Sequence, residues 1–524
     1  MHSHGTHMGT AARLLLIPFA GMLAAGCAIG PNTGPGVVRD GGSKGIPTSE
    51  SAKPEVPALG GVKSDLDWRD CPPATTAQYG VRPDAAIKVQ CATMVNRANP
   101  ATPGGDRVTV PLMRVSRADT PPGAAPLVTV TGADLPAGQF ALALANGPSG
   151  KALLSKHAIV AVEQRGLADI DCMTRADRTV IADNGLVGRD SDPVERVDRV
   201  ARAARSAADS CNDTLDDNSL AFTYALAATD IEALRTKWGV EKVAVLGAGS
   251  GAEVALSYAA QYANRVGRII VDSPTPFAGT AKERATTRVR GVEQALETFT
   301  RRCTTNPACR GREADPGAVL ASVLRKASAG ALSGINDAEL TQTVMIEIGL
   351  ATDPSRSREL IAALAAADKG NTGALAAMVR RNSAVQNSDG MQVSRCNNVT
   401  GTAGLNEIEG LVDSWPKQYP LTGQTAAISL ARCSGWSTAS PVSAPTGFAV
   451  APLVFGTGAD PVNGSDPAAL NKLFLEARTS PTTVSWDGVG YSVLAHSDCA
   501  ADLVNDYLDP EALSGDRTRA CPAG

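Results

Sequence analysis

A glycine-rich turn between a buried strand and a helix constrains the fold of this chain more than any other feature. Residues 242–246 form a short, mostly apolar run, residues 247–251 follow as Gly-Ala-Gly-Ser-Gly, and residues 252–262 have the composition of a packed helix. Residues 268–271 then supply another short apolar run. A strand, a tight turn, a helix and a second strand in this order are typical of a parallel sheet. The turn therefore predicts an α/β fold on a mostly parallel, doubly wound sheet.

Segments on either side of the turn extend this pattern. Runs that are rich in valine or alternate in polarity predict strands at residues 87–95, 107–115, 126–131, 157–163, 452–456 and 482–486. An apolar period of 3.6 residues predicts a helix over residues 224–238, with Gly239 as its C-cap. A final helix is predicted at residues 500–508.

A long helical stretch interrupts the sheet pattern. Residues 276–445 are dominated by alanine-rich amphipathic segments. Helices are predicted there at residues 284–302, 318–327, 338–351 and 357–366. An insertion of roughly 170 residues exceeds any ordinary connection, and we expect it to cap the carboxyl edge of the sheet, where ligands bind in open α/β folds. The expected domains are a core of residues 65–275 and 446–524 and a helical cap of residues 276–445.

The N-terminal segment is typical of a bacterial lipoprotein. Arg13 precedes the apolar run of residues 14–23, which is too short to span a bilayer and is followed by Ala-Ala-Gly-Cys ending at Cys27. Small residues before a cysteine resemble a lipobox, so residues 1–27 are predicted to be a lipoprotein signal peptide whose Cys27 is acylated. The alternative is an ordinary secretory signal with Cys27 incidental.

A polar tether follows the predicted lipobox. Residues 28–64 are rich in Gly, Pro, Ser and Lys without an apolar period, and we expect them to be disordered. The predicted location is therefore the extracytoplasmic face of the cell membrane, with Cys27 as the lipid anchor. Met8 is an alternative start, because it would give the signal peptide a more usual length.

Cysteine usage and charge exclude several classes of partner. Eleven cysteines are present, and an even number beyond Cys27 in an exported chain predicts five disulfide bonds, with the pairing open from spacing alone. They are Cys71, Cys91, Cys172, Cys211, Cys303, Cys309, Cys396, Cys433, Cys499 and Cys521. Without CxxC pairs and with few histidines, we expect no metal and no other cofactor. A net charge of −4 argues against nucleic acid as a partner.

Several short motifs occur in an order that resembles a known family. They are Trp-Arg-Asp-Cys at residues 68–71, Glu-Gln-Arg-Gly at 163–166, Asp-Ile-Glu-Ala-Leu-Arg at 230–235, Cys303 with Cys309, Cys-Ser-Gly-Trp at 433–436, and Cys499. Together they resemble the exported tripeptidyl aminopeptidase-like serine exopeptidases of actinobacteria, within the α/β-hydrolase superfamily. The resemblance runs from Trp68 to Cys521. It implies an α/β-hydrolase fold with an inserted helical cap.

The resemblance also implies a disulfide pairing between neighbouring cysteines. The implied pairs are Cys71–Cys91, Cys172–Cys211, Cys303–Cys309, Cys396–Cys433 and Cys499–Cys521. We interpret Glu163 and Arg165 as structural residues that pair near the sheet edge, rather than as catalytic ones.

The catalytic positions that the resemblance implies are mostly altered. The family places a serine nucleophile on a sharp turn between small flanking residues, and here Gly247 and Gly251 put Gly249 at that position. The acid is kept as Asp460 in Gly-Thr-Gly-Ala-Asp-Pro-Val. The histidine position holds Tyr491, and a phenol with a pKa of about 10 cannot replace imidazole as a base near neutral pH.

The oxyanion loop departs from the family as well. Relatives carry Gly-Gly-Pro-Gly there, whereas this chain has Thr131, Gly132, Ala133 and Asp134. An acidic side chain would repel a developing oxyanion. Because three of the four catalytic elements are changed, we predict a protein that has lost catalysis. It would act by binding a peptide, a lipid acyl chain or an envelope protein.

Two alternatives remain open from the sequence. Shifting the turn by one residue gives an active serine peptidase or esterase with Ser250, Asp460 and His496; the more ordinary roles are a helix N-cap for Ser250 and a surface loop for His496. The same turn also fits a dinucleotide fingerprint, with Asp272 after the next strand. The exported, disulfide-rich context and the position in mid-chain oppose that second reading.

Overall fold

The computed structural model describes residues 56–524, apart from residues 103, 168, 190, 511, 512, 514 and 524. The predicted signal peptide, Cys27 and most of the predicted tether lie outside the described residues. No helix in the described part of the chain is long and apolar enough to cross a membrane.

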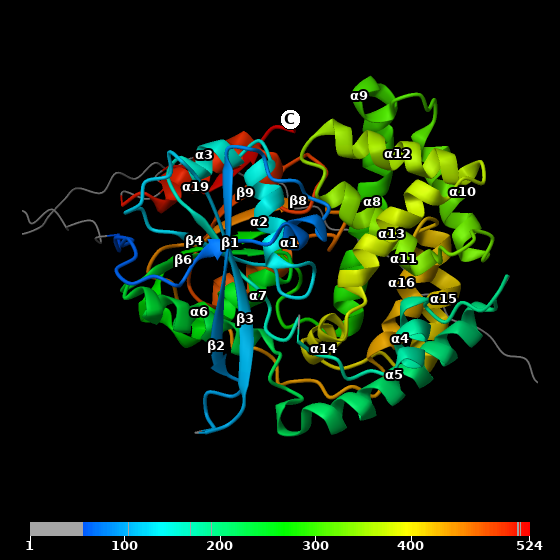
Figure 1. The fold of residues 1–524 in the computed structure, drawn as a ribbon, viewed down its shortest axis with the longest axis horizontal. Coiled ribbons are helices and arrows are strands. Elements are labelled where there is room, and N and C mark those ends of the chain that lie inside the picture. The colour runs from blue at the N-terminus through cyan, green and yellow to red at the C-terminus, as the bar shows by residue number, and fades with distance from the viewer. Residues whose placement is uncertain are drawn as a thin grey trace, which may run out of the picture. The chain divides into compact units, whose positions relative to one another are not determined.

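One ten-stranded sheet forms the centre of the fold, in the order β1-β2-β3-β5-β4-β6-β7-β8-β9-β10 (Figure 1). The strands are β1 Arg69–Asp70, β2 Ile87–Arg97, β3 Arg107–Arg117, β4 Leu127–Val130, β5 Ile159–Val162, β6 Val243–Ala248, β7 Val266–Asp272, β8 Leu453–Thr457, β9 Thr482–Trp486 and β10 Thr518–Cys521. Among the described strands, the pairings β1–β2, β2–β3 and β3–β5 are antiparallel. All pairings from β5 to β10 in this order are parallel. The predicted α/β-hydrolase fold, with a mostly parallel sheet, is confirmed.

Helices cover both faces of the parallel strands, which explains why those strands are apolar throughout. On β6, Ala244 and Leu246 point into one apolar cluster and Val243 and Val245 into the other, because alternate residues of a strand face opposite sides. The first cluster holds α2 (Ala137–Asn146), α3 (Gly150–Leu154), α18 (Val493–His496) and α19 (Asp498–Leu508). The second holds α6 (Tyr224–Trp238), α7 (Gly251–Gln261) and α17 (Asn471–Glu476). Gly239 ends α6 in a left-handed conformation, as predicted for a C-cap.

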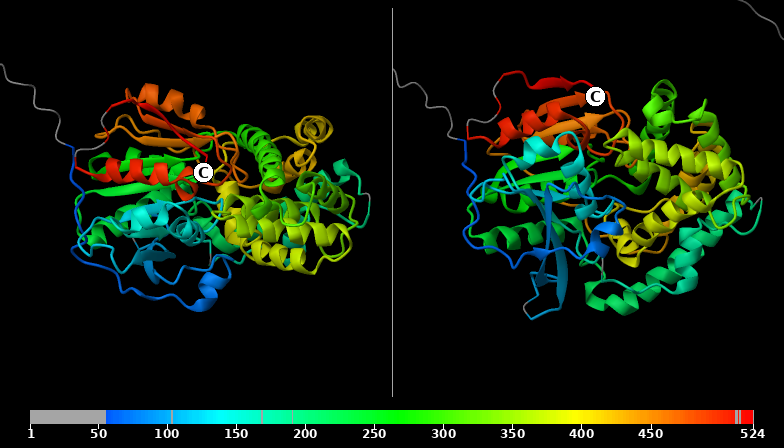
Figure 2. Two further views of the ribbon diagram at one scale, coloured as in Figure 1. Left: turned by 90° about the horizontal axis from the view of Figure 1, so that it is seen from above. Right: turned by 45° about the horizontal axis from the view of Figure 1, so that its top comes forward.

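A block of helices lies between β7 and β8 in the sequence and beside the sheet in space (Figure 2). Its helices are α8 Ala281–Thr305, α9 Pro307–Arg310, α10 Pro316–Ser328, α11 Asp337–Gly349, α12 Pro354–Asp368, α13 Gly373–Gln386, α14 Asp389–Asn397, α15 Leu405–Gln418 and α16 Gly423–Ser429, followed by the 3-10 turn η3 Leu430–Cys433. Thr280 and Glu283 form a reciprocal capping box that fixes the start of α8.

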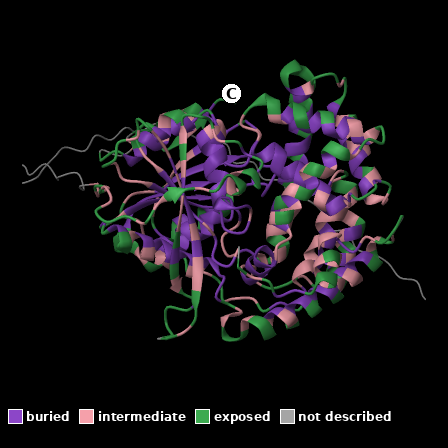
Figure 3. Ribbon diagram, viewed as in Figure 1, coloured by how far each residue is buried: buried purple, intermediate pink, exposed green. Residues whose placement is uncertain are grey.

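An earlier part of the chain joins this helical block. Helix α5 (Pro193–Leu215), which follows α4 (Arg175–Ala182), packs against α15, α16 and η3. A buried ion pair ties it to α11, because Arg196 Nη2 lies 2.7 Å from Asp337 Oδ1 and both side chains are almost fully buried. Figure 3 shows the buried residues along the facing sides of these helices and through the sheet. The block is therefore assembled from two stretches of sequence.

Short elements complete the described chain. They are α1 Pro73–Ala77, η1 Asp216–Asn218, η2 Ala263–Arg265 and η4 Pro467–Leu470.

Five disulfide bonds join the described cysteines in the pairs that the family resemblance implies. The bonds are Cys71–Cys91, Cys172–Cys211, Cys303–Cys309, Cys396–Cys433 and Cys499–Cys521.

The expectation for Glu163 and Arg165 is corrected in one respect. Both are structural, but they do not pair with each other: Arg165 forms a buried ion pair with Asp230 of α6, at 2.7 Å. Glu163 instead accepts a hydrogen bond from the backbone N–H of Ala137, at the start of α2. The reason is packing, since the guanidinium is buried where only the carboxylate of Asp230 can neutralise it.

Candidate active site at the glycine-rich turn

The turn after β6 has the backbone geometry that a nucleophile elbow needs. Gly249 has a φ of 56°, in the left-handed region, and its N–H donates to Asp272 O of β7. A Cβ on Gly247 would lie 2.4 Å from Gly251 O, and one on Gly251 would lie 2.1 Å from Val130 O. These contacts explain why the flanking positions carry glycine, and they place Gly249 at the apex of the turn.

The carboxylate of Asp134 occupies the space in front of Gly249. Its Oδ2 accepts the backbone N–H of Ser250 at 2.8 Å and the Asn463 side-chain amide at 2.5 Å, and it lies 3.1 Å from the Tyr491 hydroxyl. A Cβ built on Gly249 would come within 2.1 Å of this oxygen. A nucleophile side chain and Asp134 therefore cannot share this place.

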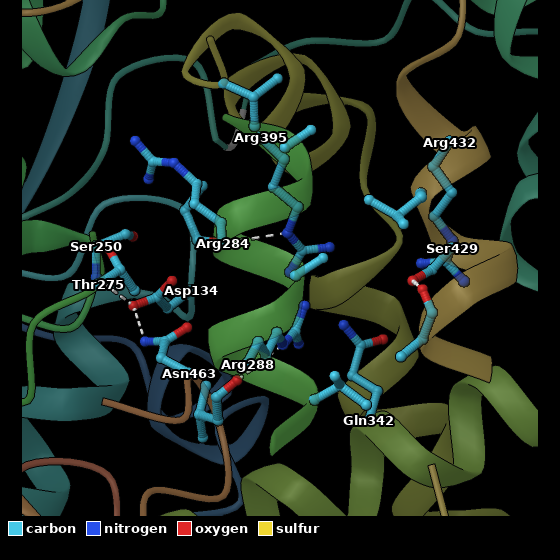
Figure 4. Close-up of a pocket in the computed structure, with 18 of the residues that line it drawn as sticks. Asp134, Ser250, Thr275, Arg284, Arg288, Gln342, Arg395, Ser429, Arg432 and Asn463 are labelled. Atoms are coloured by element: carbon cyan, nitrogen blue, oxygen red, sulfur yellow. Dashed lines mark hydrogen bonds between the residues drawn. The ribbon is translucent and has the colours of Figure 1, made fainter. Parts of the chain in front are cut away.

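Asp134 also fills the oxyanion position. In α/β-hydrolases the backbone N–H of the residue after the nucleophile is an oxyanion donor, and here that residue is Ser250. The sequence led us to expect that Asp134 would repel an oxyanion from nearby. The structure shows a more direct effect, because the Asp134 carboxylate itself accepts the hydrogen bond from the Ser250 N–H (Figure 4).

Burial opposes the negative charge of the Asp134 carboxylate, whereas the groups around it favour that charge. Burial raises the pKa of Asp134, while the hydrogen bonds from Ser250 and Asn463 and the positive charge of Arg288 act in the opposite direction. The hydrogen bonds show that the site is arranged around an acceptor oxygen.

Tyr491, which the resemblance places at the histidine position, is fully buried. Its hydroxyl lies 3.0 Å from Ala248 O, and its ring packs edge-on against Phe140. Burial and the charge of Asp134 raise its pKa well above the usual value. The phenol therefore stays protonated at neutral pH and cannot accept a proton from a nucleophile.

Asp460 is kept in position but lacks a partner for one of its oxygens. Its Oδ1 accepts the backbone N–H groups of Val462 and Asn463, whereas its buried Oδ2 has no hydrogen-bond partner among the described residues. In an active triad a histidine N–H would donate to this carboxyl. Burial raises the pKa of Asp460 to about 8, so the isolated carboxyl is protonated at neutral pH.

This raised pKa predicts a pH-dependent loss of stability. Between the ordinary pKa of 3.8 and the folded value of about 8, the folded state holds a proton that the unfolded state has released. The free energy of unfolding therefore falls as pH rises. Relative to Asp460→Asn, which does not titrate, the natural chain should lose about 1.4 kcal/mol per pH unit from pH 5 to pH 8. Urea unfolding at several pH values checks this, and a difference that is independent of pH would contradict it.

The alternative triad of Ser250, Asp460 and His496 is not joined by hydrogen bonds in the structure. Ser250 Oγ donates to Thr131 O at 3.1 Å. His496 Nδ1 lies 2.9 Å from Ser492 O, and its buried Nε2 has no partner among the described residues. Burial lowers the pKa of His496 to about 4, so the ring is neutral at pH 7.

Of the ordinary roles that we weighed for these two residues, the N-cap position of Ser250 is confirmed, whereas the surface loop expected for His496 is corrected. Ser250 occupies the N-cap position of α7, but its side chain makes no capping hydrogen bond because Oγ is turned to Thr131. His496 is not a surface loop residue: it ends α18 and its ring lies 5.7 Å from that of Trp486.

Both carboxylate oxygens of Asp272 accept hydrogen bonds from other residues of the fold, which argues against the dinucleotide-binding alternative. Its carboxylate accepts the Ser492 hydroxyl at 2.6 Å and the backbone N–H groups of Val493 and Leu494 at 2.8 and 2.9 Å. These contacts anchor the segment that carries Tyr491. No oxygen of Asp272 is left free to bind a ribose hydroxyl.

A cavity of about 260 Å³ lies between the turn and the helical block. Asp134, Ser250 and Asn463 line its sheet side, and residues of α8, α11, α14 and η3 line the other. Four arginines also line it: Arg284, Arg288, Arg395 and Arg432 (Figure 4). These arginines were not predicted from the sequence, because they are spread over three helical elements and no local pattern links them. In the described part of the chain no group of three or more His, Cys, Asp or Glu is placed to hold a metal ion.

Comparisons with known proteins agree with the architecture. A family model described as the alpha/beta hydrolase fold matches residues 180–368, and one described as TAP-like protein matches residues 419–519. No curated protein sequence matches the chain significantly.

Solved structures give only distant likenesses. A proline iminopeptidase from Mycobacterium smegmatis is 12% identical, with 80% of this chain and 97% of that one covered and a TM-score of 0.37. Esterase E22 is 13% identical, covering 81% and 100% with a TM-score of 0.36, and a bacterial membrane phospholipase A is 11% identical, covering 83% and 89% with a TM-score of 0.34. TM-scores this low do not support any conclusion about the activity of this chain. By its strand order and the two family models, the chain is an α/β-hydrolase that resembles the TAP-like proteins.

Proposed function

We propose that this chain is a non-catalytic member of the α/β-hydrolase family that acts by binding a ligand beside the former active site. One observation carries the proposal: Asp134 Oδ2 lies in the space of a nucleophile side chain and accepts the Ser250 N–H that would otherwise bind an oxyanion. A substrate carbonyl would have to displace a carboxylate held by several hydrogen bonds before any reaction could begin.

The state of the other positions supports the same proposal. Tyr491 cannot serve as a base, and the carboxyl of Asp460 has no imidazole to orient. The cavity that faces these residues supplies a place for a ligand. From the sequence we further propose that a lipid on Cys27 holds the chain at the extracytoplasmic face of the membrane, where an envelope component could reach the cavity.

The second candidate function is an active serine peptidase or esterase that uses Ser250, Asp460 and His496. The observation in its favour is that Ser250 lines the cavity. It requires His496 to leave Ser492 O and the Trp486 ring, and Asp460 to lose its proton.

A fluorophosphonate probe separates these two functions, since it reacts with activated serine hydroxyls. We expect the full chain to show no labelling above that of a Ser250→Ala variant, under conditions in which an active serine hydrolase is labelled fully. Labelling of the natural chain that disappears in Ser250→Ala would overturn the non-catalytic proposal.

A further inference from the structure

Three of the arginines around the cavity have no acidic partner. Arg288 of α8 donates through Nε to Val462 O, and Arg432 of η3 donates through Nε to Asn184 Oδ1. Arg395 of α14 donates to Ala133 O and to Gln386. No carboxylate lies within ion-pair distance of these three guanidinium groups among the described residues. The fourth, Arg284, is different because it pairs with Glu253.

These three arginines repel one another across the cavity. Burial, together with the charges of Arg288 and Arg432, lowers the pKa of Arg395 to about 9. Burial and the charge of Arg288 similarly lower the pKa of Arg432 to about 10. Unpaired like charges in a partly dehydrated site are unfavourable unless an anion joins them. Figure 4 shows the three side chains reaching the cavity from separate elements.

The charge balance of the cavity indicates what kind of anion would fit. Asp134 is the single acidic residue among those that line it, so Arg288, Arg395 and Arg432 leave a formal excess of two positive charges, three less one. One carboxylate would neutralise only half of this excess. A phosphate monoester carries about −1.5 to −2 charges at neutral pH and offers three acceptor oxygens, and guanidinium groups bind such oxygens in pairs.

The remaining lining supplies further hydrogen-bonding groups and an apolar wall. The hydroxyls of Thr275 and Thr341 are more than nine-tenths buried and have no hydrogen-bond partner among the described residues, although both residues line the cavity. Ala285, Val289 and Val292 of α8 form an apolar strip along the same cavity. A ligand with a phosphate group and an apolar or neutral remainder matches both features.

We propose that this cavity binds a phosphate group, held by Arg288, Arg395 and Arg432. The inference rests on the proposed function, of which it names the ligand class. The phosphate is a monoester that belongs either to a lipid with a terminal phosphate headgroup, as in phosphatidic acid, or to a small soluble ester, and both present the same dianionic oxygens to the arginines.

Calorimetric titration of the full chain at constant ionic strength tests the proposal. The probes are inorganic phosphate, glycerol 1-phosphate and dihexanoyl phosphatidic acid below its micellar concentration, with acetate as the monovalent comparison. We expect saturable phosphate binding that is stronger than any binding of acetate. If phosphatidic acid binds at least tenfold more tightly than inorganic phosphate, the site takes a lipid headgroup; similar affinities assign it to soluble phosphate esters. Absence of saturable phosphate binding would overturn the proposal.

Arginine variants show whether the binding occurs in this cavity. Arg288→Gln and Arg432→Gln should each weaken phosphate binding about tenfold or more, since each removes charge-assisted hydrogen bonds. The matched control is Arg290→Gln, which removes the same charge from an exposed position of α8 beside Asp466 and should leave the affinity unchanged. Either single variant suffices if the other does not fold. Equal weakening in the control would overturn the assignment.

A further variant predicts the opposite change. Asp134→Asn removes the negative charge that competes for Arg288, so it should tighten phosphate binding several-fold. Fluorophosphonate labelling keeps the two proposals distinguishable. An unlabelled chain that fails to bind phosphate overturns only the ligand class, whereas a labelled chain that binds phosphate overturns only the loss of catalysis.

Discussion

A variant that carries Gly249→Ser, Asp134→Gly and Tyr491→His should react with a fluorophosphonate at least about a thousandfold faster than the natural chain. Removal of Asp134 would free both the space beside residue 249 and the Ser250 N–H. Because the Tyr491 ring edge lies 2.8 Å from a Cβ built at Gly249, a shorter imidazole there would come within reach of the new hydroxyl. The unpartnered Oδ2 of Asp460 could then accept its N–H.

Two further variants separate the effect of the space that Asp134 occupies from the effect of the missing catalytic base. Gly249→Ser alone should remain unlabelled, since its Cβ would meet Asp134 Oδ2 at 2.1 Å and no histidine is present to activate it. Adding Asp460→Asn to the triple variant should lower its labelling rate strongly, because a histidine held by an amide adopts the wrong tautomer. Rapid labelling of Gly249→Ser by itself would show that Asp134 does not block the site. Circular dichroism on each variant controls for folding.

Asp230→Ala should destabilise the protein by about 3–5 kcal/mol, because it leaves the charge of Arg165 buried without a counter-charge. Arg165 is fully buried, and both Nε and Nη2 bind the carboxylate, at 2.8 and 2.7 Å. Its other N–H groups bind the carbonyl oxygens of residues 97, 98 and 221. This one guanidinium therefore joins the end of β2, the middle of α6, the segment that precedes α6 and the segment after β5.

Denaturant unfolding with the disulfides intact measures this effect. Asp67→Ala is the matched control, because it removes an aspartate from an ion pair with Arg69 in which both side chains are more than three-quarters exposed. Such a surface pair contributes little to stability. A loss in Asp230→Ala no larger than that in the control would contradict the role assigned to the buried pair.

Most of the sheet was predictable because its strands have short-range signatures. The apolar runs of β4, β6 and β7 are buried on both faces, and such burial leaves a continuous apolar segment in the sequence. The helix α6 was predicted together with its C-cap for the same kind of local reason. The two-residue strand β1 and the terminal strand β10 were not predicted, since neither is long enough to show a period and each is defined by the neighbour that it pairs with.

The sequence predicts which residue types occupy the positions of the site, but it does not predict the contacts that these residues make with one another. The sequence and the family that it resembles predict that Gly249 replaces the serine, that Tyr491 replaces the histidine and that Asp134 lies in the oxyanion loop. Their joint arrangement does not follow. Position 134 precedes α2, position 463 follows β8 and position 491 precedes α18, and only the fold brings them to one oxygen atom.

The sequence by itself determined the class of fold and, through the resemblance, the disulfide pairing, and it predicts that no serine–histidine pair stands at the family positions. These depend on local patterns and on residue identities, which a linear chain displays directly. Only the tertiary structure decided that Asp134 takes the oxyanion donor and that three unpaired arginines surround one cavity. The reason is physical: hydrogen bonds and charge repulsion depend on distances of a few ångströms, and residues 134, 288, 395 and 432 are far apart until the helical block packs against the sheet.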